Sequence, residues 1–393
     1  MSRIFITGYG AISAMANTAD DHLPFLSGEK TAPAFAPSRY ASTSLKHPVA
    51  EVKADNETLR HIDNDLTVPD FHSRSTLLHL HAAKQALKMA GLVADRQPID
   101  LVCATTGAGI EVTENNYQDL HSGPLFKNFI TSTISTTIAQ QLGLQGEIHM
   151  ISTACSSSAN AILLGARRIK SGLSKHIVVG GGDALSRFSL NGFNSLEILS
   201  ADGCKPFDEN RNGVTLGEAA AYLVLEDEES AKGKNILAEI VGYANTNEAF
   251  HPTASSAEGE GPLAAMQAAL QIAHIQPSDI GYINAHGTGT IVNDLAEAVA
   301  IEKLFGNTTP VSSTKGITGH TLAGCGSLEA IFTLLALNHQ QIWPNFNLQT
   351  PLKETNIHLT TNATSAAYQY AMSNSFGFGG NNTAIIFSRF NRP

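Results

Sequence analysis

One cysteine in the sequence stands where a nucleophile would be well placed. Cys155 follows the short apolar run 148–151 and precedes residues 156–170, whose apolar side chains recur at helical spacing. It is therefore predicted at a sharp turn from a strand into a helix, where unpaired N–H groups and the helix dipole favour a thiolate. Buried, inert cysteines are nevertheless common, so position alone does not establish a nucleophile.

Two histidines and a lysine lie in loops of similar character. His286 stands in a Gly- and Thr-rich loop after a predicted strand, and Lys315 and His320 stand in a second loop of this kind. A third glycine-rich loop is predicted at 374–382. Because loops at strand ends gather in one crevice in parallel α/β folds, these residues are expected near Cys155. A thiol, two imidazoles and an amine in one crevice suit acyl transfer to the thiol.

The same residues also allow a structural role or a metal site. With 15 histidines in the chain, a structural position is the default for any one of them. A zinc site made of Cys155, His286 and His320 is a further alternative, but zinc ligands usually include a close pair in the sequence. The glycine turn at 8–10 lacks the third glycine and the acidic residue of a dinucleotide-binding turn.

The composition describes a compact, loop-rich protein. With 393 residues, 42% of them hydrophobic and 15% charged, the chain is long enough for two domains or one duplicated unit. The net charge of −10 argues against nucleic acid as a partner. Four scattered cysteines without a CxxC pair indicate reduced thiols and a cytoplasmic location. No window approaches 18 uninterrupted apolar residues, so no membrane span is expected.

Alternating strand and helix patterns must position the loops. Strands are predicted at 3–7, 101–104, 149–152, 176–179, 221–225, 280–284, 310–313 and 383–387, and helices at 73–90, 156–170, 262–274, 295–305 and 327–338. This alternation favours an α/β fold with buried sheets. The last helix is apolar nearly all round, so we expect it between two layers.

The order of loops and helices suggests two similar halves. In both the cysteine region and the lysine–histidine region, a predicted strand is followed by a polar loop and then by an apolar helix. We therefore predict an N-terminal half, 1–240, with the nucleophilic cysteine, and a C-terminal half, 241–393, with the two histidines. Residues 29–69 are predicted as a surface excursion and 108–135 as an insertion or cap. A glycine turn is predicted at 8–10.

Taken together, the motifs resemble those of the β-ketoacyl-acyl-carrier-protein synthases, the elongating condensing enzymes of the thiolase-like superfamily. The resemblance spans residues 3–390 and rests on four motifs in the family's order, around Cys155, His286, His320 and residues 374–380. It implies a thiolase-like α/β fold of αβαβα layers built from two similar halves. It also implies decarboxylative Claisen condensation, with substrates carried on the phosphopantetheine arm of acyl carrier protein and with no further cofactor or metal.

The resemblance assigns a role to each central residue. Cys155 would accept the acyl chain, while His286 and His320 would bind the malonyl thioester and promote loss of carbon dioxide. Neutral imidazoles are needed to donate an N–H to the enolate oxygen, so a desolvated site would help. The backbone N–H groups of Cys155 and Phe378 would form an oxyanion hole. Phe378 would also act as a gate between the acyl pocket and the malonyl entrance.

Five further residues take supporting roles in the resemblance. Lys315 belongs to the catalytic set and, with Glu329, resembles the family's buried ion pair that orders the histidine loop. Phe376 is expected behind the catalytic side chains. Ala108 and Val214 are expected in the acyl pocket, and each stands where the family usually has a larger residue.

These departures favour a specialised synthase of a polyketide or aryl-polyene type of pathway over one of general fatty acid synthesis. The partners implied are acyl carrier protein and either a second copy of the chain or a chain-length-factor-like paralogue. The alternative is a non-catalytic or weakly active partner subunit of a ketosynthase heterodimer, against which the intact catalytic residues argue. Four basic residues are candidates for carrier docking: Arg60, Arg74, Lys127 and Lys205.

Overall fold

The computed structural model describes residues 2–41, 43–61, 69, 72–94, 97–118 and 124–390. The larger elements of the first half are β1 (Ile4–Ser13), α3 (Arg74–Ala90), β2 (Asp100–Ala104), α6 (Ser132–Leu142), β3 (Ile148–Ile151), α7 (Ser157–Lys170), β4 (His176–Asp183), α8 (Arg187–Ser195) and β5 (Ala219–Asp227). Those of the second half are β6 (Ala238–Asn247), α9 (Glu260–Ala273), β7 (Ile280–Asn284), α10 (Ile291–Phe305), β8 (Pro310–Ser312), α12 (Cys325–His339), β12 (Tyr370–Gly377) and β13 (Asn381–Ser388).

Shorter elements connect these. They are α1 (Leu23–Leu26), α2 (Asn56–His61), α4 (Ile110–Asn116), α5 (Pro124–Lys127), α11 (Lys315–Thr318), β9 (Gln341–Ile342), β10 (His358–Leu359), β11 (Thr364–Ser365) and the 3-10 turns Asp20–His22, Pro277–Asp279 and Leu322–Gly324. The predicted cap at 108–135 thus contains α4, α5 and the start of α6 in its described part.

The two halves repeat one strand order. The first half is arranged β3-β2-β4-β5-β1 and the second β8-β7-β12-β13-β6. In each half the first three strands are parallel, and the fourth is antiparallel to both of its neighbours. The halves join where β1 pairs with β6 over two residues of each strand.

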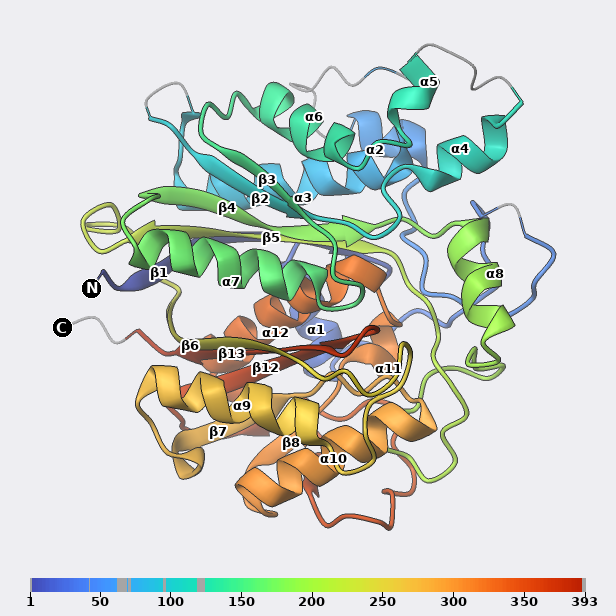
Figure 1. Cartoon of the computed structure of the whole chain (residues 1–393), viewed down its shortest axis with the longest axis vertical. Coiled ribbons are helices and arrows are strands. Elements are labelled where there is room, and N and C mark those ends of the chain that lie inside the picture. Colours follow the sequence, from blue (N-terminus) through green and yellow to red (C-terminus); the bar gives the residue numbers. More distant parts are fainter. Residues whose placement is uncertain are drawn as a thin grey trace.

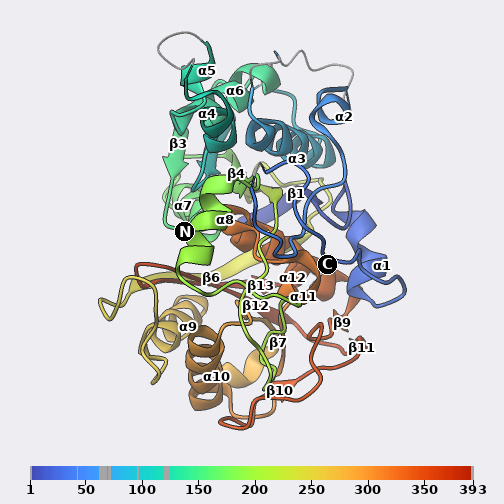
Figure 2. The same cartoon turned by 90° about the vertical axis from the view of Figure 1, so that its right-hand side faces the viewer.

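Five layers result from this arrangement (Figure 1). α3 and α6 cover the outer face of the first sheet, α7 and α12 lie between the sheets, and α9 and α10 cover the outer face of the second. Figure 2 shows the same layers from the side, with α8 crossing near the junction of the two halves. The predicted αβαβα fold of two similar halves is confirmed.

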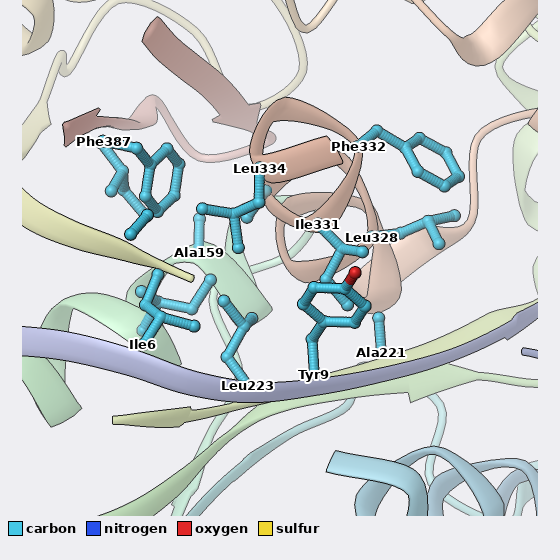
Figure 3. Close-up of a cluster of buried hydrophobic side chains, with 14 of the residues drawn as sticks. Ile6, Tyr9, Ala159, Ala221, Leu223, Leu328, Ile331, Phe332, Leu334 and Phe387 are labelled. Atoms are coloured by element: carbon cyan, nitrogen blue, oxygen red, sulfur yellow. The ribbon is translucent and has the colours of Figure 1, made fainter. Parts of the chain in front are cut away.

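The core between the sheets is built around α12. Figure 3 shows Leu328, Ile331 and Leu334 of this helix among side chains from β1, β5, α7 and β13. The segment Leu322–His339 is long and apolar enough to cross a membrane by composition, but 89% of it is buried in the protein. The prediction that this helix is sandwiched between layers is confirmed. Trp343, which follows it, is fully buried and donates its indole N–H to the carbonyl of Phe332.

The glycine turn predicted after the first strand is wrong. β1 continues through Gly8 and Gly10 without a turn. Glycines occur at these two positions because α3 lies directly against the strand. A Cβ atom at Gly8 would stand 2.3 Å from the carbonyl oxygen of Ala86, and one at Gly10 would stand 2.2 Å from that of Ala82. These glycines therefore allow a helix to approach a strand, and they do not reverse the chain.

Besides the two-residue strands β9, β10 and β11, two long strands lie where the sequence pattern predicts none. β6 falls in a segment with no predicted strand, and β12 extends into the segment 374–377 that is predicted as loop. β12 is nevertheless almost entirely buried, between β7 and β13. Many of its side chains are small or polar, so the segment lacks the apolar run by which buried strands are usually predicted.

Candidate active site

Cys155 lies at a tight turn between β3 and α7. The preceding residue, Ala154, has φ of 51°, which is the left-handed conformation that non-glycine residues seldom adopt. Two hydrogen bonds close the turn: the Thr153 N–H donates to Ser157 Oγ at 2.8 Å, and the Ser157 N–H donates to the Ala154 carbonyl at 3.1 Å. This geometry puts Cys155 at the start of α7 with its side chain 7% exposed, as the sequence predicts.

A cavity of about 390 Å³ opens in front of this turn. Six of the residues singled out by the sequence line it: Cys155, Val214, His286, His320, Phe376 and Phe378. The exposed lining residues Leu196, Ile291 and Val292 mark an apolar mouth. The structure thus brings together residues from both halves at one accessible site.

His286 is held by contacts on three sides. Its backbone N–H donates to Glu297 at 2.8 Å, while Lys315 Nζ donates to its carbonyl at 2.6 Å and lies 3.2 Å from its Nδ1. An ammonium group only donates, so Nδ1 accepts and the ring proton is on Nε2. Burial lowers the pKa of His286 well below its ordinary value, and the neighbouring Lys315 and His320 lower it further. His286 is therefore a neutral N–H donor.

His320 presents the same nitrogen in the same form. Its Nδ1 accepts the backbone N–H of Leu322 at 3.1 Å, and the Sγ of Cys325 lies 3.5 Å away. Nδ1 is an acceptor in this contact, so the ring proton is again on Nε2. The rings of His286 and His320 are 5.6 Å apart and nearly perpendicular. Two Nε2–H donors therefore stand side by side in the cavity that contains Cys155.

The Lys315–Glu329 ion pair lies behind His286. Both side chains are buried, and the ammonium contacts the carboxylate directly. Burial alone would lower the pKa of Lys315, but its acidic neighbours, Glu329 foremost, together outweigh burial and hold that pKa above its ordinary value. The resemblance suggests that this pair orders the loop of His320. Its direct contacts are instead with His286, which it fixes and keeps neutral.

Sequence analysis missed two buried carboxylates that support the His286 loop. Glu297 accepts the N–H groups of His286 and Gly287, both at 2.8 Å, and burial raises its pKa to about 7. Asp294 accepts the N–H of Gly289 at 3.1 Å, and burial raises its pKa as well. The signal that could have found them is a pair of acidic residues, three apart, among the mainly apolar residues 291–301 of α10.

Phe378 and Phe376 stand on either side of the histidines. Phe378 occupies the hairpin turn between β12 and β13, and its ring stacks on that of Phe193 at 5.8 Å. The Phe193 ring in turn lies 6.2 Å from that of His320. Phe376 lies edge-on to His286 at 5.9 Å. Each histidine is thus held against an aromatic ring.

The two residues predicted in the acyl pocket lie in different places. Val214 is 2% exposed and lines the cavity. Ala108, with φ of 49°, belongs to the apolar cluster between the first sheet, α3 and α6, and it does not contribute to the cavity lining. Of these two positions, therefore, only Val214 faces the cavity.

One candidate for carrier docking is excluded by burial. Arg74 is 2% exposed, and its guanidinium forms an ion pair with Glu218 at 2.6 Å. The same guanidinium donates to the carbonyl of Val52. Arg74 therefore holds the interior together and is not available to a partner. Lys205 is partly exposed and pairs with Asp202.

Comparisons with known proteins show which family the chain matches. The chain matches the model of the β-ketoacyl synthase N-terminal domain over residues 1–231 and that of the C-terminal domain over 237–349. A 3-oxoacyl-[acyl-carrier-protein] synthase 2 of Staphylococcus aureus (strain COL) is 34% identical over 417 residues, which cover 99% of this chain and 98% of that protein.

Two solved structures are similar over the whole chain. A ketosynthase from Xenorhabdus doucetiae, in complex with its chain length factor, has a TM-score of 0.87 and 32% identity, covering 99% of this chain and 98% of that one. The ishigamide ketosynthase/chain length factor has a TM-score of 0.91 and 27% identity, covering 99% of this chain and all of that one.

Proposed function

Since the chain belongs to the β-ketoacyl synthase family, it is an acyltransferase, and we propose that it acts as a 3-oxoacyl-acyl-carrier-protein synthase. It condenses malonyl-acyl-carrier protein with an acyl group held on Cys155. Both substrates arrive on phosphopantetheine arms, and no further cofactor takes part. The reaction takes place in the cytoplasm, in keeping with four free cysteines.

The first step moves the acyl group to the protein. The Cys155 thiolate attacks the carbonyl carbon of the acyl thioester, and the backbone N–H groups of Cys155 and Phe378 stabilise the resulting oxyanion. The tetrahedral intermediate collapses, the carrier thiolate leaves and takes a proton, and a thioester to Cys155 remains. Both residues line the cavity, Cys155 at the start of α7 and Phe378 in the turn between β12 and β13.

The second step uses the two histidines. The malonyl thioester carbonyl accepts the Nε2–H groups of His286 and His320, and the bond to the terminal carboxylate breaks with release of carbon dioxide. The electron pair stays on the substrate as an enolate, whose oxygen both N–H groups stabilise. Its carbon then attacks the acyl carbonyl on Cys155. The thiolate leaves, and a 3-oxoacyl thioester remains on the carrier.

One observation carries this proposal. Two imidazoles whose Nδ1 atoms are both occupied by hydrogen-bond partners lie side by side at one cavity, and the cavity also contains a thiol at a helix start. A hydrolase of the cysteine type needs a histidine that accepts a proton from the thiol. Here both histidines have their acceptor nitrogen occupied by Lys315 or by a backbone N–H. Donation to an enolate therefore fits the arrangement better than proton abstraction.

The experiment is intact-protein mass spectrometry after incubation with acyl-carrier protein. The wild-type protein should gain one acyl mass, and added malonyl-carrier protein should remove it with release of carbon dioxide. Cys155→Ala should gain none, a loss of at least ~1000-fold. Cys103→Ala, at a buried thiol outside the cavity, is the matched control and should acylate normally. Acylation of Cys155→Ala would disprove the proposed role of this thiol.

For the partner, we propose a second chain of the same fold, of the chain-length-factor type. The relative from Xenorhabdus doucetiae was solved with such a partner. In this chain, exposed apolar residues lie in α5 and beside it in the sequence (Tyr117, Phe126, Phe129 and Ile130), and Ile148 is exposed on the end strand β3. An end strand with apolar neighbours is an open template for a partner chain. Products of a polyketide or aryl-polyene type are consistent with that pairing.

Purification, co-expression and substitutions at these exposed residues distinguish a heterodimer from a homodimer. Purified alone and then co-expressed with a paralogue, the chain should form a stable, active dimer only in the second case. Phe129→Asp should weaken that dimer, whereas Phe250→Asp, at an exposed aromatic residue on the second half, should not. A stable and active homodimer would exclude the heterodimer. Activity that depends on the paralogue's own cysteine and not on Cys155 would favour the non-catalytic alternative.

A further inference from the structure

A cluster of asparagines ties the hairpin turn of Phe378 to the turn of Cys155. Its centre is Asn381, the first residue of β13. The Oδ1 atom of Asn381 accepts hydrogen bonds from Asn160 Nδ2 at 2.7 Å and Asn245 Nδ2 at 2.7 Å. It also lies 2.8 Å from Ser156 Oγ, whose single hydrogen is shared with the Thr153 carbonyl at 2.8 Å. These donors come from the cysteine turn, α7 and β6. A single carbonyl oxygen thus joins three separate elements to the hairpin.

The cluster closes on itself and uses every amide hydrogen of its donors. Asn160 gives its second Nδ2 hydrogen to Thr153 Oγ1 at 2.8 Å, and Asn245 gives its second to Thr383 Oγ1 at 2.8 Å. The Thr383 hydroxyl then donates to Asn160 Oδ1 at 2.9 Å. The contacts are short and mutually compatible, so they define one orientation for each amide.

The base of the hairpin presses directly on the cysteine turn. Asn381 faces Gly377 across the two strands, and Phe378 lies in the turn that they enclose. A Cβ atom at Gly377 would stand 2.9 Å from the Thr153 carbonyl oxygen and 3.0 Å from Ser156 Oγ. The hairpin and the cysteine turn are therefore in van der Waals contact, with Asn381 beside the contact.

We propose that Asn381 is a positioning residue that sets the separation of the two oxyanion donors. One donor, the N–H of Cys155, precedes Ser156, and the other, the N–H of Phe378, belongs to the hairpin that Asn381 closes. The inference rests on the proposed function, because it assumes that these amides bind the tetrahedral oxyanion. Asn381 does not touch the reacting atoms and acts through the backbone on either side of it.

Removal of the shared acceptor would leave buried donors of the asparagine cluster unsatisfied. Without Oδ1 of Asn381, the amide hydrogens of Asn160 and Asn245 face each other with no acceptor between them, and buried donors without acceptors are costly. The hairpin then moves until water or another group satisfies them. An oxyanion hole works only when its donors are fixed before the charge develops. Acyl transfer should therefore suffer, while decarboxylation at His286 and His320 should not.

The experiment compares two substitutions at one position. Asn381→Ala removes the acceptor. Asn381→Asp keeps an oxygen for the three donors and removes no used donor, because within the described residues the Nδ2 of Asn381 has no hydrogen-bond partner. Asn362→Ala, at an exposed asparagine, is the matched control. For each protein we would measure acylation of Cys155 by a small acyl thioester, carbon dioxide release from malonyl-carrier protein, and the thermal unfolding midpoint.

Asn381→Ala should slow acylation by ~10-fold or more, with Asn381→Asp and the control within about threefold of wild type. Carbon dioxide release should change less than threefold in all of them. Equal slowing by Ala and Asp, equal loss of both reactions, or normal acylation of Asn381→Ala would each overturn the inference. A wild-type protein that accepts the small thioester but no carrier substrate would refute the proposed function and leave this inference standing. A wild-type protein that accepts neither would refute both.

Discussion

The cysteine turn of the first half and the lysine–histidine loop of the second half occupy equivalent places in the two sheets. The first follows β3 and the second follows β8, each the third strand of its half in chain order, and each leads into the helix that its half contributes to the middle layer. Residues 152–156 form the first, a short turn held by hydroxyl and amide groups. Residues 313–324 form the second, a longer loop that includes the buried, charged Lys315.

The difference separates two tasks. A nucleophile needs one fixed position beside N–H groups, which short neutral hydrogen bonds provide without adding charge. Histidines that donate to an enolate must stay neutral, and a buried ammonium beside one of them lowers its pKa. One half therefore supplies geometry and the other supplies electrostatics. Substitutions in the two loops should accordingly affect different steps of the reaction.

The largest expected effect comes from the histidines. His286→Ala and His320→Ala should each reduce carbon dioxide release from malonyl-carrier protein by ~100- to 10,000-fold, because a positioned donor is lost. Acylation of Cys155 should change by less than about 10-fold, because the cysteine turn is untouched. Rapid-quench mass spectrometry measures both steps on the same sample. His358→Ala, at an exposed histidine, is the control, and equal loss of both steps would refute the division of tasks.

Breaking the buried ion pair should come next. Glu329→Ala leaves the Lys315 ammonium buried without its partner and should lower the free energy of unfolding by ~3–5 kcal/mol. Ser156→Ala, which removes a neutral hydrogen bond at the cysteine turn, should cost only ~1 kcal/mol. Denaturant titration gives both values. The double variant Lys315→Met, Glu329→Leu should recover stability but not carbon dioxide release, and recovery of both would show that the charge is dispensable.

A smaller effect is expected at Glu297. Its carboxylate accepts two backbone N–H groups, whereas Glu297→Gln offers only one amide oxygen for them. Carbon dioxide release should therefore fall ~10-fold, the equivalent of one lost hydrogen bond. Stopped-flow measurement of the decarboxylation step is the test. Acylation should stay within about threefold, since Glu297 belongs to the second half.

The pH dependence of stability checks the same residue. Burial raises the pKa of Glu297 to about 7 from an ordinary value of 4.5, so the folded protein keeps a proton that the unfolded chain releases. Its contribution to stability is full below the ordinary value and is lost as pH rises through about 7. The destabilisation caused by Glu297→Gln should therefore be larger at about pH 5 than at about pH 8. The opposite trend would contradict a protonated Glu297.

His286 should act in the other direction. Burial lowers the pKa of His286, so at a pH below its ordinary value the unfolded chain binds a proton at this residue and the folded protein does not. Stability from this group is present above its ordinary value of 6.5 and is lost as the pH falls below it.

The smallest effect concerns the wall of the cavity. Val214→Phe should fill part of the space beside Cys155 and reduce acylation by long acyl donors by about 10-fold, with short donors within about threefold. Competition between two carrier-bound chains of different length, scored by mass spectrometry, measures the ratio. An unchanged ratio would mean that the acyl chain does not pass Val214.

The sequence predicts the fold class and the loops of the site because both depend on local patterns. A strand followed by small residues and a helix is enough to locate Cys155 and His286. The supporting contacts escape prediction because they join segments far apart in the chain. Asn374, for example, lies in a strand that shows no apolar run, yet its amide donates to Glu297 across the core at 3.2 Å. Its polarity becomes meaningful only once that partner is known.

Glycine is the other source of error. In β1, Gly8 and Gly10 suggest a turn, but they serve to admit α3 at close range. Around Phe378, Gly379 and Gly380 do form a turn, with φ of 82° and 76°. The residue type is the same in both places, and only the packed neighbour distinguishes them. The sequence pattern therefore shows where glycine is needed. It does not show whether the glycine allows a close helix contact or a turn.

The position of Trp343 gives the protein a built-in optical reporter. It is the single tryptophan of the sequence, and it lies fully buried against the helix that separates the two sheets. Excitation of the indole should yield emission at short wavelength from the native state and at long wavelength once water reaches the middle layer. Fluorescence therefore follows opening of the shared core without any label. Each variant described above can be compared on that common scale before its activity is interpreted.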